Sequence, residues 1–278
     1  MPGCGATSSW KTARGLHRCT ACQRQTAAVA GTVLEGTRKP LRTWSQAIWY
    51  VTNQKLGVSA LGLQRVLGLG SYQTAWTWLH KLRRAMARPG RDRLRGLVEI
   101  DETYVGGVEE DTDGRETRDK SIVVIAVEVL SPKGFGRIRL ATVPDASRLH
   151  LVPFVCEVVE PGSTVRTDGW AGYADLEIHG YRHVRKVLLG SRAPAHVTMP
   201  GVHRIASLLK RWLLGTHLGA VSQKQLDYYL DEFAFRFNRR ASRARGLLFY
   251  RLLQQAVAVE PAPYRQLVTP KPSADHQL

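Results

Sequence analysis

Two aspartates stand in separate strand-like segments of this 278-residue chain. Asp101 lies in residues 98–107 and Asp168 in residues 164–173, and glycines follow each of them. Carboxylates presented by neighbouring strands can hold divalent metal ions against a phosphodiester. The chain also carries a net charge of +17, which attracts a polyanion. The pattern predicts an enzyme that cuts nucleic-acid strands.

Strand geometry decides which carboxylates share a face. Successive side chains of a strand point to opposite sides, so Asp101 shares a face with Glu99, whereas Glu102 points away from it. We choose Asp101 as the metal ligand because the Asp-x-x-x-x-Gly-Gly pattern leaves room for a close backbone turn. Asp168 precedes Gly169 at a strand end, where a ligand can approach. A single aspartate there is usually only solvated, but the pair in a basic chain favours a two-metal site.

A third ligand is expected on a helix over residues 200–214. No Asp or Glu occurs between Glu177 and Asp227, and this helix offers His203 and Lys210 instead. Seven residues at about 100° each return to nearly the same helix face. An imidazole nitrogen can coordinate metal, and an ammonium group suits a phosphate. The alternative is that His203 only caps the helix or touches DNA.

The elements that position these residues follow from hydrophobic periodicity. β-branched segments separated by polar turns predict an antiparallel meander, followed by a crossover helix and further strands. The expected elements are strands over 97–105, 121–130, 136–143, 164–167 and 181–189, with a helix over 147–159. This order predicts an α/β sheet covered by helices.

Residues 41–88 show helical periodicity instead. Ser59 and Ser71 are expected to cap two helices that a glycine-containing turn separates. This layout, with a basic end on the last helix, is typical of a helix-turn-helix, although any three-helix bundle gives similar periodicity. The residues expected to contact DNA there are Lys81, Arg83 and Arg84.

Three cysteines, Cys4, Cys19 and Cys22, mark the N-terminal segment as a possible zinc ribbon. The opening resembles a Cys-Pro-x-Cys-Gly knuckle with Met1 where the first cysteine should stand. His17 is a weaker candidate for the fourth ligand, since it is more simply read as an ordinary strand residue. A three-cysteine remnant that binds no metal is the alternative for the whole segment.

Composition limits the class of protein. The hydrophobic content of 44% can fill a core, and four cysteines are too few for a disulfide scaffold. Residues 1–96 carry a net charge of +14, residues 97–200 of −4 and residues 201–278 of +7, so basic ends flank the acidic centre. No apolar run reaches the length of a membrane span and no signal-peptide pattern opens the chain, which predicts a cytoplasmic protein.

Four motifs in this order resemble the bacterial insertion-sequence transposases of the ISXO2-like, or IS1595, family. They are Asp-Glu-Thr-Tyr-Val-Gly-Gly at 101–107, Thr-Asp-Gly-Trp-Ala-Gly-Tyr at 167–173, Ser-Leu-Leu-Lys-Arg with Gly-Thr-His between 207 and 217, and Tyr-Leu-Asp-Glu-Phe-Ala-Phe-Arg-Phe-Asn-Arg-Arg at 229–240. The resemblance implies an α/β, ribonuclease-H-like catalytic domain preceded by a small zinc-ribbon-like segment and an all-helical helix-turn-helix domain. The implied parts are a degenerate or truncated ribbon (1–36), the helix-turn-helix region (37–92), the catalytic domain (96–258) and a flexible tail (259–278).

The resemblance also implies roles for single residues. Asp101 and Asp168 become the first two metal ligands, and Lys210, with Arg211, becomes a DNA-binding group. Many relatives carry Glu at the third ligand position, where this sequence has His203. A nitrogen ligand is less suited to Mg²⁺ than a carboxylate and favours Mn²⁺.

The implied activity is metal-dependent cleavage and transfer of DNA strands at terminal inverted repeats. Terminal-repeat and target duplexes are then the partners, and a homo-oligomer is expected because two ends must meet. One alternative is a catalytically impaired remnant that only binds DNA. Another is a nuclease selective for junctions or hybrids, which leaves the helix-turn-helix without a purpose.

Overall fold

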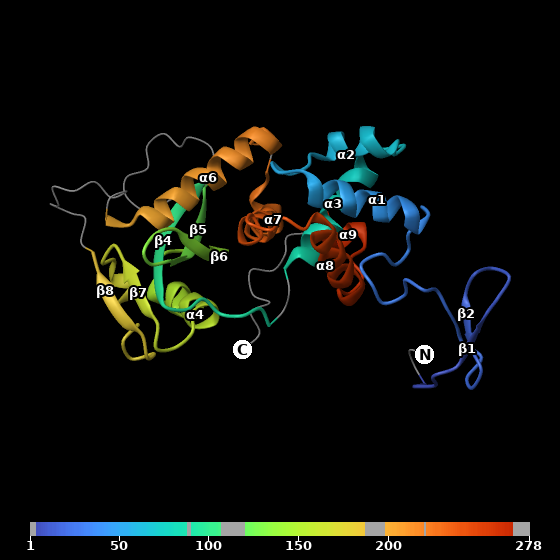
Figure 1. Cartoon of the computed structure of the whole chain (residues 1–278), viewed down its shortest axis with the longest axis horizontal. Helices are drawn as coiled ribbons and strands as arrows, with labels where there is room; N and C mark the ends of the chain where they lie inside the picture. The colour runs from blue at the N-terminus through green and yellow to red at the C-terminus, as the bar shows by residue number, and fades with distance from the viewer. Residues whose placement is uncertain (1–3, 88–89, 107–119, 187–197, 220, 269–278) are drawn as a thin grey trace.

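The computed structural model describes residues 4–87, 90–106, 120–186, 198–219 and 221–268. Its N-terminal part is a small antiparallel ribbon, drawn in dark blue in Figure 1 at the end of the molecule opposite the large sheet. The ribbon consists of β1 (Ser9–Lys11), β2 (His17–Cys19) and β3 (Gln25–Thr26). Such short strands bury little apolar surface, and folded units of this size usually need a cross-link or a metal for stability.

Three helices follow the ribbon: α1 (Leu41–Asn53), α2 (Ala60–Leu67) and α3 (Tyr72–Met86). The Ser59 hydroxyl accepts a hydrogen bond from the Gly62 N–H, and the Ser71 hydroxyl accepts one from the Thr74 N–H, each at 3.1 Å. Gly68 ends α2 in the left-handed region with φ of +59°. The helices and both serine caps are therefore confirmed.

Of the C-terminal helices, α8 (Arg245–Ala258) packs against α1 and α3, and α9 (Tyr264–Val268) packs against α3. Leu252, Ala256 and Leu267 are fully buried in the same core as α1 and α3. The expectation of a flexible tail from residue 259 is thus wrong as far as residue 268, because Leu267 anchors α9; residues 269–278 lie outside the described part. Apolar packing also assigns α8 to the helical core rather than to the sheet.

The main sheet has five strands: β4 (Leu97–Val105), β5 (Ser121–Val129), β6 (Phe135–Val143), β7 (Thr164–Thr167) and β8 (Arg182–Arg185). Their order is β6-β5-β4-β7-β8; β4, β5 and β6 are antiparallel, whereas β7 runs parallel to both β4 and β8. The strands stand where the periodicity predicts them, except for the last one. It is expected over residues 181–189 but covers only Arg182–Arg185; Tyr181 and Lys186 lie outside the strand, and residues 187–189 lie outside the described part of the chain.

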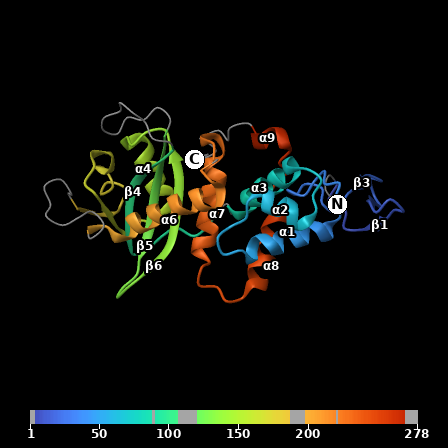
Figure 2. The ribbon, with the colours of Figure 1, turned by 90° about the horizontal axis from the view of Figure 1, so that it is seen from above.

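Helices cover both faces of this sheet, as Figures 1 and 2 show. The covering helices are α4 (Arg148–Val158), α6 (Pro200–His217) and α7 (Leu226–Asn238), and short 3-10 turns occupy Ala171–Tyr173 and Gln223–Gln225. Val98 and Ile100 pack under α4, whereas Val123 and Ile125 pack under α6 and α7. This mixed sheet between helices fits the α/β, ribonuclease-H-like expectation. None of the described helices combines the length and apolarity that a membrane crossing requires.

A buried ionic network joins the helical core to α7. Glu232 on α7 is paired at 2.7 Å with Arg83 on α3 and also at 2.7 Å with Arg236, one turn further along α7. Arg236 then donates to the carbonyl oxygens of Val51 and Gln54 at the end of α1. Because the side chains of Arg83 and Glu232 are only 2% and 1% exposed, water screens their attraction little.

Candidate active site

Parallel pairing of β4 with β7 brings Asp101 and Asp168 together. The ladder pairs Glu99 with Arg166, and the same register continued by two residues sets Asp101 beside Asp168. Burial raises the pKa of Asp101, and the negative charge of Asp168 raises it further. Both carboxylates are half-buried and repel each other, so a cation bound between them would stabilise their charged forms.

Asp101 faces the helix α6. Alternation places Asp101 with Glu99 on the α6 face of β4, while Val98 and Ile100 point into the α4 core. Glu102, on the face opposite Asp101, lies near the fully buried Tyr173, whose pKa is raised well above its usual value by burial and by the Glu102 carboxylate.

Glu99 fixes the start of α6 against β4, a role that the sequence did not reveal. Its Oε2 accepts hydrogen bonds from the backbone N–H groups of Gly201 (2.7 Å) and Val202 (3.2 Å), and its Oε1 pairs with Arg166 at 3.1 Å. An added Cβ at Gly201 would stand 2.6 Å from the Glu99 carboxylate, so the helix approaches this closely because residue 201 is glycine. The available signal was strand alternation, which put Glu99 on the Asp101 face without showing its partners.

The anchored helix brings His203 to the aspartates. Its Nε2 is buried and hydrogen-bonds to no described residue, and its electrostatic effect lowers the pKa of Asp101. Two carboxylates and a free imidazole nitrogen form a donor set that suits Mn²⁺ or Mg²⁺. The ligand atoms of Asp101, Asp168 and His203 are not all within 4.8 Å of one another, a spacing that only the N-terminal cysteines reach among the described residues.

Lys210 and Arg211 lie on the exposed side of α6. The buried side of this helix carries Ile205, Leu209 and Leu213, which pack on the sheet. Lys210 follows His203 by two turns, so both stand on the same side of the helix, as the spacing predicts.

The loop after β7 holds Asp168 in a tight turn. Asp168 Oδ1 accepts a hydrogen bond from the Trp170 N–H at 2.9 Å, and Gly169 adopts φ of +87°, a conformation that disfavours side chains. Trp170 is 39% exposed and donates its indole N–H to the Ala146 carbonyl. Asp168 is therefore held by its own backbone turn.

The three N-terminal cysteines converge in the ribbon. The Sγ atoms of Cys4 and Cys19 are 3.4 Å apart, and all three sulfur atoms lie within 4.8 Å of one another. A hydrogen bond from the Cys22 N–H lowers the pKa of Cys19 to about 7, which favours the thiolate that binds metal. His17 lies on β2 and is not part of this group, as expected for an ordinary strand residue.

The residues expected to touch DNA on α3 require a correction. The Arg83 guanidinium is buried against Glu232 and stacks 4.0 Å over the Tyr229 ring. Lys81 is only 8% exposed and donates to the Glu35 carbonyl. Arg84 is half-buried. The basic end of α3 faces the protein interior because α7, α8 and α9 pack on it, which the periodicity of α3 alone could not show.

Part of the chain matches the model of a known protein family. Residues 93–238 match the family model for the ISXO2-like transposase domain, and this range contains Asp101, Asp168, His203 and Lys210. No curated protein matches the chain. One similar solved structure is described as the crystal structure of a pre-cleavage Mos1 transpososome; it shares 14% sequence identity over 81% of each chain, with a TM-score of 0.29.

Proposed function

The chain belongs to the ISXO2-like transposase family, and from this premise we propose that it cuts and joins DNA strands at the terminal inverted repeats of its own insertion sequence. The observation that carries the proposal is the convergence of Asp101, Asp168 and the unpartnered His203 Nε2 within the matched domain. The net charge of +17 supports a polyanionic substrate.

Asp101, Asp168 and His203 are the residues that hold Mg²⁺ or Mn²⁺, with Mn²⁺ favoured by the nitrogen ligand. Bound divalent metal supplies Lewis acidity toward the attacking water or 3′-hydroxyl and charge stabilisation at the leaving oxygen. Glu99 keeps the His203 helix against the strand that carries Asp101. Lys210 binds a backbone phosphate and positions the strand in line with the ligands.

DNA binding is assigned to the ribbon and to the helical region. Cys4, Cys19 and Cys22 are three ligands of a zinc ion that stiffens the ribbon. Since the basic end of α3 is buried, contact with base edges falls to its exposed first turn at Tyr72 and Gln73, the part of a recognition helix that enters the major groove. Two such chains act together on two element ends.

The second candidate is a remnant that binds repeat ends without cutting them. It is favoured by the wider separation of the three proposed ligands and by histidine in place of the family's usual glutamate. Binding of repeat-end DNA without Mn²⁺-dependent nicking by the unmodified chain would select this candidate.

The test compares three single variants on repeat-end duplex DNA with Mn²⁺. Asp101→Asn and Asp168→Asn should abolish nicking and keep DNA binding. Asp175→Asn, which alters an exposed ion pair with Arg148, is the matched control and should cut normally. Mn²⁺ should also raise the melting temperature of the unmodified chain and of Asp175→Asn, but not of Asp101→Asn. Undiminished cutting by either site variant would contradict the assignment.

A further inference from the structure

The C-terminal end of α6 leaves two leucines in water. Leu214, in the last turn of α6, is 64% exposed, and Leu218, directly after the helix, is 86% exposed. Leu218 also adopts φ of +53°, in the left-handed region that favours glycine. Large apolar side chains stabilise a protein when they are buried. Exposed leucines, one of them in a costly backbone conformation, therefore indicate a contact with a partner.

Gly215 keeps the surface beside these leucines open. An added Cβ at Gly215 would meet no atom within 4 Å, and the backbone of Gly215 lies outside the left-handed region. Neither crowding nor backbone conformation in the described chain therefore requires glycine here, although glycine inside a helix is less stable than alanine. The missing side chain lets a partner approach the helix backbone closely.

Helix geometry sets Leu214 in line with the candidate metal site. Eleven residues separate His203 from Leu214, and at about 100° each they make about three full turns. Both side chains therefore stand on the same side of α6 as Lys210. The rise of the helix sets His203 and Leu214 about 16 Å apart along the axis. Figure 1 shows α6 running along the sheet toward the helical core, so this line of residues leads away from the aspartates.

The surroundings of the leucines on α6 are cationic. Lys210 and Arg211 are exposed one turn earlier, and the sequence has no acidic residue between Glu177 and Asp227. A second copy of the chain would bring like charges to this surface, whereas the phosphates of DNA complement them. DNA grooves also offer apolar surface, and leucine is one of the side chains that proteins insert between base steps.

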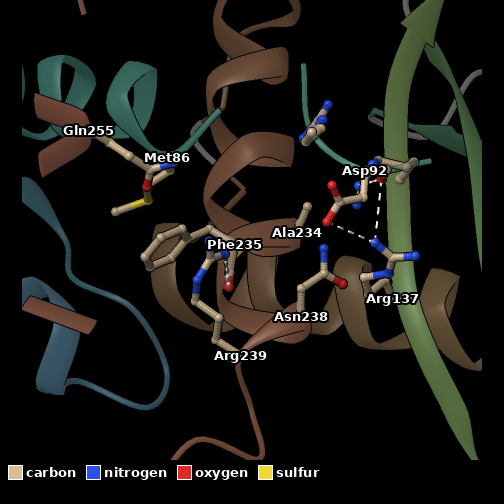
Figure 3. Close-up of a pocket in the computed structure, with 10 residues that line it drawn as sticks. Met86, Asp92, Arg137, Ala234, Phe235, Asn238, Arg239 and Gln255 are labelled. Carbon is tan, nitrogen blue, oxygen red and sulfur yellow. Dashed lines mark hydrogen bonds and ion pairs between the residues drawn. The ribbon is translucent and has the colours of Figure 1, made fainter. Parts of the chain in front are cut away.

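A cavity of about 280 Å³ between the sheet and the helical core is another basic region, but two of its arginines are held by the protein. Figure 3 shows Arg137 on β6 and Arg239 directly after α7. Arg137 pairs with Glu128 at 2.7 Å, and Arg239 stacks over the Phe235 ring and donates to the Phe235 carbonyl. The cations on α6 are exposed instead, which makes α6 the better surface for a polyanion.

We propose that α6 lies along the DNA and that Leu214 and Leu218 pack into a groove of the duplex, with Lys210 and Arg211 on the flanking phosphates. The choice of DNA as the partner rests on the proposed function. Because DNA rises about 3.4 Å per base pair, the distance of about 16 Å from His203 to Leu214 sets the leucines about 5 base pairs from the phosphate that is cut. The leucine pair thus fixes the direction in which the duplex leaves the site.

The first arm of the test measures binding of a mixed-sequence duplex by fluorescence anisotropy over a series of salt concentrations. Leu214→Ser and Leu218→Gly should each weaken binding about tenfold and leave its salt dependence unchanged, because an apolar contact releases no counterions. Lys210→Gln should instead lower the slope of log affinity against log salt by about 1. Leu247→Ser is the matched control, since Leu247 is 61% exposed on α8, and it should bind normally.

Leu218→Gly separates binding from folding. Glycine relieves the left-handed conformation, so the melting temperature should equal or exceed that of the unmodified chain while DNA binding falls. A lowered melting temperature would assign Leu218 to the fold, and normal DNA binding by either leucine variant would also overturn the proposal. If Leu214→Ser abolishes a dimer seen by sedimentation without DNA, the leucines contact a second copy and the proposal is wrong.

The second arm locates the leucine surface on repeat-end DNA, with the photo-cross-linker p-benzoylphenylalanine in place of Leu214. Cross-links should centre about 5 base pairs from the nicked phosphate. The same replacement at Leu247 should give no such centre. Cross-links at the nicked phosphate itself, or spread evenly over the duplex, overturn the path along α6. If the unmodified chain does not nick, the proposed function fails, while the affinities of the first arm still test the leucine surface.

Discussion

Replacing Glu232 by glutamine should strongly destabilise the fold. The Glu232 side chain is 1% exposed, and it neutralises Arg83 and Arg236 at 2.7 Å each. Breaking one partner of a buried ion pair typically costs about 3–5 kcal/mol, because the remaining charge stays buried without compensation. A domain of ordinary stability has only about 5–15 kcal/mol in total, so Glu232→Gln should lose a large share of it.

The lowered pKa of Glu232 shows the same interaction as a dependence of stability on pH. Burial alone would raise this pKa, but Arg236 and Arg83 outweigh burial and lower the pKa from 4.5 to about 2. Such a shift corresponds to about 3 kcal/mol of folding free energy. Because the folded pKa is the lower one, this stability is present above pH 4.5 and is lost as the pH falls toward 2.

Two histidines beside the network, the buried His80 and the half-buried His217, add a separate acid dependence. Burial, followed by the nearby Arg83 charge, lowers the pKa of His80 to about 2 and that of His217 to about 4, from 6.5 in each case. The unfolded chain therefore binds protons first as the pH falls below 6.5, and stability declines there too. Below pH 4.5 the loss from Glu232 adds to that from His80, which continues down to a pH of about 2.

Urea unfolding followed by tryptophan fluorescence at a series of pH values tests this account. At neutral pH, Glu232→Gln should unfold about 3–5 kcal/mol more easily than the unmodified chain, with less added loss in strong acid. Glu177→Gln, a change at an exposed acid, is the control and should match the unmodified chain. A double replacement, Arg83→Met with Glu232→Leu, should recover stability relative to Glu232→Gln. If Glu232→Gln lowers the free energy of unfolding by less than about 1 kcal/mol, the reasoning is refuted, because an exposed ion pair contributes that little.

Three further outcomes are expected. Glu99→Gln turns an amide NH₂ toward Arg166, so it should lower both the melting temperature and the rate of Mn²⁺-dependent cutting. A normal cutting rate would show that Glu99 does not position the site. Burial, together with the Asp168 charge, raises the pKa of Asp101. As the pH is lowered, the Mn²⁺ affinity measured by calorimetry should therefore begin to fall at a higher pH than for an isolated aspartate. An affinity that is independent of pH would count against Asp101 as a ligand. Cys19→Ser should abolish the binding of one zinc equivalent measured by a chelator titration, while Cys156→Ser, outside the cluster, should not; equal zinc binding by both variants would reject the ribbon site.

Local sequence patterns predicted much of the fold. Alternating β-branched residues predicted the strands to within a residue or two, except at the last one, and Ser59 and Ser71 predicted the starts of α2 and α3. These features depend on neighbours close in sequence, such as a hydroxyl and an N–H three residues apart. Four motifs in a fixed order, the first of which contains Asp101, also predicted the family, which the match over residues 93–238 confirms.

Residues that look alike in the sequence acquired different surroundings in the folded chain. Arg83 resembled a DNA-binding residue until α7 placed Glu232 beside it, 149 residues further along the chain. Leu267 resembled part of a frayed end until the helical core enclosed it. Burial depends on which distant elements pack together, and periodicity within one helix carries no information about its partners.

The sequence by itself determined which residues could do chemistry, namely two aspartates, a histidine with a lysine seven residues later, and three cysteines. The tertiary structure decided which of them meet and what holds them. Parallel pairing of β4 with β7 sets Asp101 beside Asp168, and Glu99 draws the His203 helix onto the same strand across 102 residues of chain. The physical reason is that metal binding, ion pairing and desolvation depend on distances in space, which only long-range packing fixes.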